Sequence, residues 1–574
     1  MQHPGFELAP LLGNFDVNSV VSLMQYLTFS GFVFSSLRLF CITVACSEAL
    51  AQSALEDFFT WQGESNQALA EYGKSVGGAG DVNGDGFADV LVGCHYYSNP
   101  EFHEGKVFLY YGSPEGINPL EGWSFESNTE NATLGISVSG AGDLNNDGFD
   151  DVIVGAHTFT GDQNSEGKVY VFYGSEDGLG DVPDWEMEGN QEGCDFGGIV
   201  SEAGDVNGDS YDDIIIGAIF YDGAEVDQGR AYVFYGSEGG LTSTPWTAEI
   251  AEPGITFGSH VSGAGDVNND GFSEVIIGCR KYTNGENSEG GAFVFYGSPS
   301  GLEPDYTWHF ESNLTGTKLG QSVSTAGDVN NDGFSDVIIS GHNYSQPETD
   351  EGYALNFNGS ASGLSFAPDF QLESNLTNAL FGNQCANAGD VNGDGYDDVI
   401  IGSREYSNGE TSEGRVYVFL GSSSGLLETD LWLAESNQES AFFGYSVSSA
   451  GDVNGDGADD VIIGAKYWDG GEEDEGGAFV FLGIPPSPCP SVSGVSIGSI
   501  TSSSVTVSWA DDADASSYNV IVKSKGELKN YFVTSNSVTI PGLTSSTNYK
   551  IIIRSQCGSQ FSLRSFGGTF TTLP

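Results

Sequence analysis

One nine-residue stretch, Asp81–Asp89, occurs seven times in this chain at a nearly constant spacing. Its sequence is DVNGDGFAD, and the later copies differ from it at only a few positions. The copies begin at Asp81, Asp143, Asp205, Asp266, Asp328, Asp390 and Asp452, which are 61 or 62 residues apart. A period this regular indicates an array of one structural unit.

The stretch offers oxygen atoms at alternate positions. They are the side chains of Asp81, Asn83 and Asp85, the carbonyl of Phe87 and the side chain of Asp89. Hard cations such as Ca²⁺ bind six to eight oxygens. The glycine after the third ligand allows the chain to fold back around an ion, because glycine adopts left-handed dihedrals at little cost. The stretch therefore predicts a cation-binding turn.

The turn is not an EF-hand. An EF-hand requires an acidic ligand at its twelfth position and a helix on either side. The twelfth residue is apolar and β-branched in every copy, within runs that read as strands. These residues are Val92, Val154, Ile216, Ile277, Ile339, Ile401 and Ile463.

Each repeat arranges its signals in the same order. An aromatic-Gly or Leu-Gly pair is followed by a short strand, the loop and a second strand such as Asp89 to Gly93. A variable segment, a third strand (105–112 in the first repeat) and a fourth strand with an aromatic residue complete the unit. About seven units of four antiparallel strands predict an all-β, seven-bladed propeller over residues 56–484.

The two ends of the array are complementary. Phe58 to Trp61 read as a fourth strand with no repeat before it, whereas the array stops after a third strand at Ala478 to Leu482. Pairing these two segments would complete the last blade and remove two open sheet edges. The fourth strands are then marked by Trp61, Trp123, Trp185, Trp246, Trp308, Phe370 and Trp432.

Residues 1–51 contain no repeat signal. An apolar stretch follows Arg38, and Ala49-Leu50-Ala51 is typical of a signal peptidase site, so we expect a secretory signal with a possible true start at Met24. A membrane anchor and a lipid-modified Cys46 are the alternatives, and Arg38 argues against a membrane span. We expect no transmembrane helix after signal cleavage.

The C-terminal part differs from the array in composition and in sequence pattern. Residues 485–488 form a proline-rich linker, and residues 489–574 have few acids and alternating strand patterns around Trp509, Tyr518 and Tyr549. This module resembles a fibronectin type III domain, including the tyrosine corner at Tyr549. Cys489 and Cys557 are placed to bridge its ends as a disulfide. Cys94 and Cys279 replace alanines of other repeats and are expected to be buried.

The charge of the chain limits its partners. It has 81 acidic and 17 basic residues, for a formal net charge of −64. Seven Ca²⁺ ions would reduce this to about −50. Nucleic acid is excluded as a partner, because phosphate binding requires basic patches. We expect a monomer.

The repeats resemble the FG-GAP propeller of integrin α subunits and of many secreted bacterial proteins. In that family the loop binds Ca²⁺ between the first two strands of a blade. The resemblance implies up to seven structural Ca²⁺ ions. Their ligands would be Asp81, Asn83, Asp85, Phe87 and Asp89; Asp143, Asn145, Asp147, Phe149 and Asp151; Asp205, Asn207, Asp209, Tyr211 and Asp213; Asp266, Asn268, Asp270, Phe272 and Glu274; Asp328, Asn330, Asp332, Phe334 and Asp336; Asp390, Asn392, Asp394, Tyr396 and Asp398; and Asp452, Asn454, Asp456, Ala458 and Asp460. The fourth residue of each set contributes its backbone carbonyl.

Two loops depart from the pattern. Ser210 replaces the glycine of the third loop, and Glu274 replaces the closing aspartate of the fourth. We expect these two sites to be the weakest. Because all seven loops are alike, we expect structural rather than catalytic ions, since catalysis needs a differentiated site with an open coordination position.

A second set of candidate residues follows the second strands, on the face opposite the loops. The set combines bases with aromatic residues, and we interpret it as the binding site for an extracellular protein or carbohydrate ligand. The residues are His95, Tyr96, His157, Arg280, Tyr282, His342, Arg404, Tyr406, Lys466 and Trp468. The alternative is that each base pairs with an acid of its own blade, such as Glu104, Glu166, Glu289, Glu351, Glu413 or Glu475.

No enzyme motif occurs: there is no nucleophile elbow, His-x-x-x-His pair or phosphate-binding glycine loop. The expected function is therefore that of a secreted or cell-surface, calcium-binding adhesion protein. The alternative is a hydrolase or lyase, active on polysaccharides or phosphodiesters, that uses the His and Arg residues of this face.

Overall fold

A computed structural model describes residues 54–56, 59–120, 122–428, 431–485, 495–510, 515, 517–524, 527–557, 560–561 and 565–573. The predicted signal segment and Cys489 lie outside these residues. The described residues form strands, turns and loops without a helix. Accordingly, no helix that could span a membrane is found among them.

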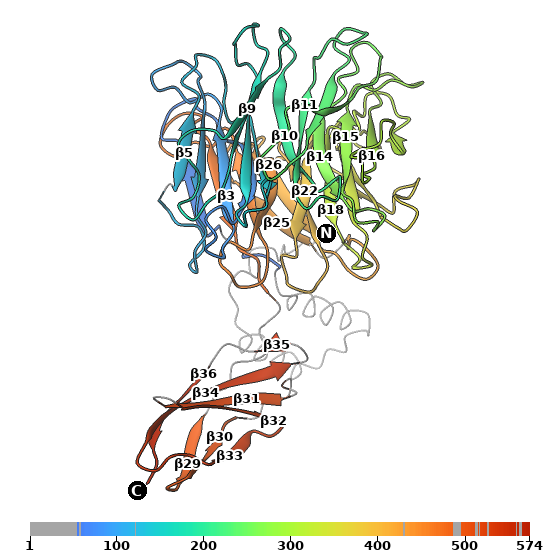
Figure 1. Ribbon diagram of the computed structural model, residues 1–574. Helices are drawn as coiled ribbons and strands as arrows, with labels where there is room; N and C mark the ends of the chain where they lie inside the picture. The colour runs from blue at the N-terminus through green and yellow to red at the C-terminus, as the bar shows by residue number, and fades with distance from the viewer. Residues whose placement is uncertain are drawn as a thin grey trace, which may run out of the picture. The chain divides into compact units, whose positions relative to one another are not determined.

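Residues 61–481 form seven four-stranded antiparallel sheets, which we call blades (Figure 1). Blade 1 contains β2 (Tyr72–Gly80), β3 (Asp89–Cys94), β4 (Lys106–Tyr110) and β5 (Trp123–Glu126). Blade 2 contains β6 (Ser137–Gly142), β7 (Asp151–Ala156), β8 (Lys168–Phe172) and β9 (Trp185–Glu188). Blade 3 contains β10 (Phe196–Gly204), β11 (Asp213–Ala218), β12 (Arg230–Phe234) and β13 (Trp246–Ala248).

The remaining blades repeat this order. Blade 4 contains β14 (His260–Gly265), β15 (Glu274–Cys279), β16 (Gly291–Phe295) and β17 (Trp308–Glu311). Blade 5 contains β18 (Ser322–Gly327), β19 (Asp336–Gly341), β20 (Tyr353–Phe357) and β21 (Phe370–Glu373). Blade 6 contains β22 (Phe381–Gly389), β23 (Asp398–Ser403), β24 (Arg415–Phe419) and β25 (Leu431–Glu435). Blade 7 contains β26 (Phe443–Gly451), β27 (Asp460–Ala465), β28 (Gly477–Phe481) and β1 (Trp61–Glu64).

The first strands of the blades follow one another around a ring. Each contacts the first strand of the next blade, from β2 to β6 and on to β26, and β26 contacts β2. Blue and orange strands therefore lie side by side in Figure 1, although they come from opposite ends of this part of the chain. The seven sheets thus close into a propeller.

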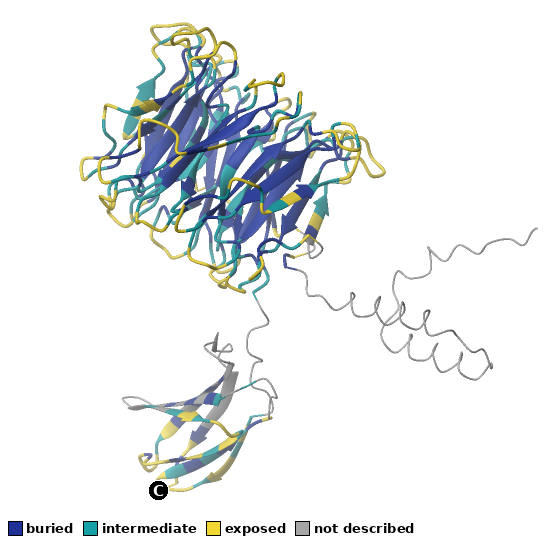
Figure 2. Ribbon diagram, turned by 90° about the vertical axis from the view of Figure 1, so that its right-hand side faces the viewer, coloured by how far each residue is buried: buried dark blue, intermediate teal, exposed yellow. Residues whose placement is uncertain are grey.

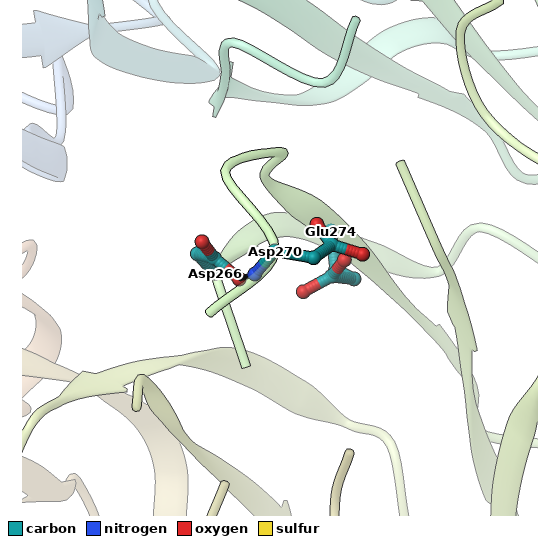
Figure 3. Close-up of side chains that lie close together, drawn as sticks. All are labelled: Asp266, Asp270 and Glu274. Carbon is teal, nitrogen blue, oxygen red and sulfur yellow. Dashed lines mark hydrogen bonds between the residues drawn. The ribbon is translucent and has the colours of Figure 1, made fainter. Parts of the chain in front are cut away.

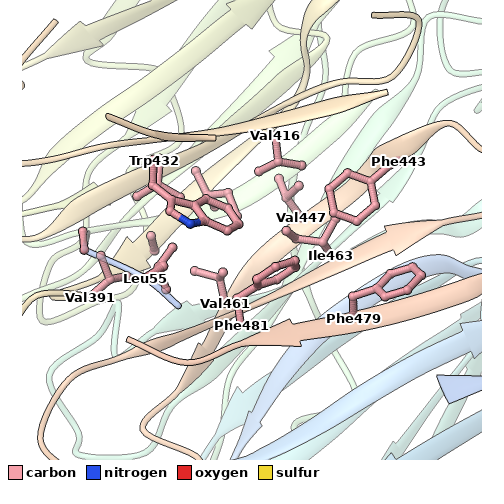
Figure 4. Packing of buried hydrophobic residues seen from close by; sticks show 14 of the residues in the cluster. Leu55, Val391, Val416, Trp432, Phe443, Val447, Val461, Ile463, Phe479 and Phe481 are labelled. Carbon is pink, nitrogen blue, oxygen red and sulfur yellow. The ribbon is translucent and has the colours of Figure 1, made fainter. Parts of the chain in front are cut away.

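The seam of the ring lies within blade 7. Strand β1 pairs with β28 in antiparallel register, with Trp61 opposite Val480. The N-terminal segment does complete the last blade, but the strand runs from Trp61 to Glu64 rather than over 58–61. The Ile484 amide also donates a hydrogen bond to the Ala54 carbonyl at 2.9 Å. Leu55 is fully buried in the cluster between blades 6 and 7 (Figure 4).

The core lies between neighbouring blades. All six residues of each second strand are buried (Figure 2). The blades approach closely where these strands end: a Cβ atom on Gly155 would lie 1.9 Å from the carbonyl oxygen of Gly197 in the next blade. Only glycine fits there. Cys94 and Cys279 are fully buried and reduced, as the sequence predicted.

The C-terminal module is a sandwich of two sheets. One contains β29 (Ser496–Ile500), β30 (Ser504–Ser508) and β33 (Ser537–Pro541). The other contains β31 (Ser517–Ser524), β32 (Glu527–Val533), β34 (Asn548–Cys557), β35 (Gln560–Phe561) and β36 (Ser565–Thr571).

Trp509 and Tyr549 are buried in the core of this sandwich. The Thr544 amide donates a hydrogen bond to the Tyr549 hydroxyl at 2.9 Å, which is the tyrosine corner expected from the sequence. The predicted pairing of Cys489 with Cys557 stays a prediction, because Cys489 lies outside the described residues.

Candidate metal loops and the opposite face

The metal loops are folded by their own acidic residues. In the first loop the Asp81 carboxylate accepts hydrogen bonds from the amides of Asp85 at 3.0 Å and Gly86 at 2.8 Å. Asp85 accepts one from the Phe87 amide at 3.1 Å. Each of these bonds recurs in the other six loops. The turn therefore gathers its carboxylates at one end of each blade.

The acid that closes each loop is fully buried. Asp89 accepts hydrogen bonds from the amides of Val82 at 3.1 Å and Gly112 at 2.9 Å. Burial raises its pKa to about 7, although these two bonds oppose the shift. The pKa of the equivalent acid in every other loop is raised to about 7 or 8 for the same reason. A cation beside each acid would favour its ionised form.

Two observations show that the donor set fits a divalent cation. First, Asp266, Asp270 and Glu274 place one oxygen each within 4.8 Å of one another (Figure 3). Second, the side-chain oxygens of Asn145, Asn268 and Asn330 are buried and accept no hydrogen bond among the described residues. Both fit the requirement of Ca²⁺ for several oxygen ligands.

The two unusual loops differ from the others in backbone conformation or in side-chain length. Ser210 has a φ of 73°, in the left-handed region that glycine occupies in the other six loops. Glu274 reaches further than an aspartate, and its loop is the one whose three carboxylates converge. The weak binding expected of these two loops stays a prediction.

The loops are also bonded to one another. In every blade the amide of the eighth loop residue donates to the carbonyl of the first residue in the preceding loop. Across the seam this bond joins Ala88 to Asp452 at 3.1 Å. At four of the seven blade interfaces an aspartate side chain adds a second bond; the Asp397 carboxylate, for example, accepts from the Asp328 amide at 2.7 Å. The metal loops form a continuous belt.

The second candidate set lies at the opposite ends of the blades. In each blade the metal loop joins the end of the first strand to the start of the second. The end of the second strand therefore lies beside the start of the first, as Cys94 lies opposite Tyr72 in blade 1. A strand of six residues spans about 20 Å, which separates the two faces. We call the loop-distant face, defined by His95, His157, Arg280, His342, Arg404 and Lys466, the rim face.

The histidines of the rim face are neutral. Burial lowers the pKa of His157 to about 4 and that of His342 to about 3. Burial also lowers the pKa of His95, whose Nε2 lies 3.6 Å from Glu71. His157 lies 3.0 Å from the Thr133 hydroxyl and 3.8 Å from Asp195. These rings can exchange hydrogen bonds with a ligand but carry no charge at neutral pH.

Three cations surround Tyr445 at the centre of the rim face. The ammonium groups of Lys74 and Lys466 lie 4.7 and 4.5 Å from its ring centroid, and the Arg404 guanidinium carbon lies 5.5 Å away. Burial alone would raise the pKa of Tyr445, but the three cations outweigh it and lower the pKa. Lys466 also pairs with Glu71 at 3.5 Å.

Sequence reasoning missed Lys74, Tyr445 and Asp195. Lys74 and Tyr445 each follow the glycine of an aromatic-Gly pair, where the first strand enters the centre of the ring. The repeat pattern of the sequence marks this position in every blade. Its residues differ from blade to blade, so only the closed ring shows which of them meet.

Most of the predicted aromatic residues pack inside their blades. Tyr406 is buried, and the Arg415 guanidinium stacks on it at 3.7 Å. Tyr282 packs edge-on against Phe293, and Trp468 against Phe479. Tyr96 is half-buried between the rings of His95 and His103. Tyr406 is therefore closed to a ligand, whereas Tyr282 and Trp468 pack against their blades and are only half-buried.

The glutamates named in the alternative pairing are engaged elsewhere. Glu166 accepts hydrogen bonds from the amides of Gly161 and Gln163, and the equivalent glutamates likewise hold the amides of their own loops. None of them forms an ion pair with a rim base among the described residues. These glutamates therefore do not neutralise the rim bases, but other acids of the same blades lie near two of them: Glu405 is 3.9 Å from Arg404, and Glu71 is 3.6 Å from His95.

A cavity of about 410 Å³ lies at the centre of the ring, on the rim side. Charged side chains in its wall are Lys74, Asp195, Arg280 and Arg404. Tyr445 and His157 lie among them. Much of the remaining wall consists of serines, Gln321 and Asn383 from the first strands. The cavity is thus polar and bounded by three positive charges and one carboxylate.

Comparison with known families agrees with this architecture. The FG-GAP repeat model matches residues 72–110, 134–172, 197–234, 381–419 and 443–481. The two unmatched repeats form blades 4 and 5, which have the same four strands as the others. The fibronectin type III domain model matches residues 490–567. Together these domains suggest an adhesion or ligand-binding role.

The repeats are similar to parts of curated proteins. Integrin alpha pat-2 of Caenorhabditis briggsae is 33% identical over 174 residues, which cover 27% of this chain and 14% of that protein. Human integrin alpha-7 is 32% identical over 186 residues, covering 32% of this chain and 15% of that protein. Human phosphatidylinositol-glycan-specific phospholipase D is 29% identical over 221 residues, covering 36% of this chain and 26% of that protein. The chain thus matches about a quarter or less of the length of these relatives. It is a protein of FG-GAP repeats followed by a fibronectin type III domain, and its repeats are similar to those of integrin α subunits.

Proposed function

We propose that this is a calcium-stabilised adhesion or ligand-binding protein of the cell exterior, which recognises a protein or carbohydrate partner through the rim face. The observation that carries the proposal is the concentration of scarce bases on that face. The chain has only 17 Lys and Arg residues, yet Lys74, Arg280 and Arg404 line one central cavity, and Lys466 lies beside Tyr445 of its wall. The similarity to integrin α repeats supports a role in adhesion.

Calcium would act as a structural ion in this function. It would be held by the seven loop sets, where it offsets the repulsion between carboxylates within each turn. An ion that binds only the folded state stabilises the protein in proportion to the logarithm of its concentration. We expect millimolar Ca²⁺ to raise the thermal unfolding temperature of the propeller and a chelator to lower it. An unfolding temperature indifferent to both would contradict the structural role.

Ligand binding is tested on glycan and protein arrays with calcium-loaded protein. The variant in which Arg280, Arg404 and Lys466 are replaced by alanine should lose capture while it remains folded. Capture by this variant equal to that of the parent protein would contradict the proposal.

The similarity to phosphatidylinositol-glycan-specific phospholipase D is the observation that favours the alternative, a hydrolase or lyase. The same array assay tests it. The similarity falls on the repeats, which both proteins share. Formation of product from an array ligand, rather than binding alone, would favour a hydrolase or lyase.

A further inference from the structure

We propose that the central cavity of the rim face binds a carboxylate-bearing sugar, a hexuronate unit, whose carboxylate lies among Lys74, Arg280 and Arg404. The inference rests on the proposed ligand-binding function and names the class of ligand. It is carried by the unpaired cations of the cavity, by its volume and by the hydroxyl and amide groups of its wall.

Two of the cations have no ionic partner. Among the described residues, neither the Lys74 ammonium nor the Arg280 guanidinium forms an ion pair. Arg280 is half-buried, and burial lowers its pKa, although Asp195 opposes this shift. Arg404 donates a hydrogen bond to the Asn383 side chain at 2.5 Å, and its Nε, which is buried without a hydrogen-bond partner, lies 3.9 Å from the Glu405 carboxylate. Buried donors of this kind are costly unless a ligand satisfies them, and a carboxylate does so best.

The acids near the cavity offset only part of these charges: Glu405 lies beside Arg404, but neither Lys74 nor Arg280 has such a neighbour among the described residues. Asp195 is the carboxylate of the wall, and burial raises its pKa to about 7. Glu71 is engaged by Lys466. The acids of the metal loops lie at the far ends of the strands, beyond the Debye length of about 8 Å at physiological salt. An anionic group entering from the rim side therefore meets local positive charge in a protein of strongly negative net charge.

The cavity suits a sugar better than the surface of a protein. About 410 Å³ lies within the range of small-ligand pockets, which is roughly 300–1,000 Å³. Besides its cations, the wall offers the hydroxyls of Ser139, Ser201 and Ser324 and the amides of Gln321 and Gln384. These groups can donate and accept hydrogen bonds with several ring hydroxyls at once.

The test is isothermal titration of the calcium-loaded full chain with D-galacturonate and D-glucuronate. D-galactose and D-glucose, which lack the carboxylate, and acetate, which lacks the ring, are the comparison ligands. We expect saturable binding of at least one uronate, and binding of the neutral sugars and acetate that is weaker by about tenfold or more. Lys74→Met and Arg280→Met should each weaken uronate binding by about tenfold, whereas Arg280→Lys should retain more of it.

Lys281→Met is the matched control, because Lys281 is exposed and adjacent to Arg280 in sequence. It should bind uronate as the parent protein does. A second readout is the ultraviolet absorbance of Tyr445. A bound carboxylate would oppose ionisation of the phenol, so uronate should shift its titration to higher pH, and Tyr445→Phe should abolish the change.

Equal binding of uronates and neutral sugars would overturn the inference, as would undiminished binding by Lys74→Met and Arg280→Met. Absence of uronate binding by a protein that still captures a partner on the arrays would also overturn it, and would leave the proposed function intact. A calcium-loaded parent protein that binds uronate but captures no partner on the arrays would instead count against the proposed function alone.

Discussion

Asp195 shows how the centre of the ring changes the chemistry of a single residue. Its φ is 64°, its carboxylate faces His157 at 3.8 Å, and burial raises its pKa to about 7 from an ordinary value near 3.8. Arg280 and Lys74 oppose this shift without cancelling it. In the folded protein the group therefore stays protonated over a pH range in which the unfolded chain would ionise it.

This difference predicts how Asp195→Asn changes stability. Because the pKa of Asp195 is higher in the folded state, its contribution to the free energy of unfolding falls as pH rises from about 4 to about 7. Asparagine does not titrate. The stability of Asp195→Asn relative to the parent protein should therefore increase across that range, by up to about 4 kcal/mol. Denaturant unfolding at several pH values measures it, and a difference independent of pH would refute the prediction.

The repeat spacing was sufficient to predict the position of the loops and strands. The reason is local: the loop of Asp81 and the apolar run after Asp89 carry their own turn and strand signals. The cluster around Tyr445 could not be predicted in the same way. Lys74, Arg404 and Lys466 lie in different blades, and they meet only because the ring closes. Burial of Tyr406 likewise depends on Arg415, a partner from the third strand.

At the scale of elements, the metal loops are connected rather than independent. The bond from the Asp328 amide to the Asp397 carboxylate joins the loops of blades 5 and 6. The equivalent position one blade earlier is Ser335, whose side chain makes no such bond among the described residues. The belt therefore has stronger and weaker interfaces, and an ion that orders one loop would act on its neighbour through them.

Asp397→Ala tests this connection. It leaves the Asp328 amide without its side-chain acceptor, and we expect a loss of about 1–3 kcal/mol in the free energy of unfolding. The calcium affinity of the blade 5 loop should also fall, although Asp397 belongs to the next loop. Unfolding and calcium titration of both proteins measure these effects.

Ser335→Ala is the matched control, at the same loop position. It should change both quantities much less than Asp397→Ala does. Equal effects of the two substitutions would show that the side-chain bond does not couple the loops.

At the scale of the whole molecule, the ring depends on the short strand β1. Trp61 is 6% exposed and packs at 4.7 Å from Tyr110, in the cluster that joins blades 7 and 1. Sequence complementarity of the two chain ends predicted this closure. It did not predict the strand bounds, because the pairing partners of β1 lie more than 400 residues away.

Trp61→Ala should therefore destabilise the propeller by about 3–5 kcal/mol, the usual effect of removing a large buried side chain. Trp185→Ala is the comparison, because Trp185 occupies the same strand position in blade 2 and is only half-buried. It should cost less. Thermal unfolding of the two variants measures the difference, and equal losses would show that the seam has no special role.

The seam also determines how the propeller would respond to tension. Residues Ala54 and Ile484 are hydrogen-bonded neighbours, so the chain enters and leaves the propeller at one point. A force that pulls these two ends apart acts first on the pairing of β1 with β28, while the other six blades lie outside its path. An adhesion protein built in this way would yield by releasing one short strand, and its remaining blades would stay folded to re-form the ring when the force ceased.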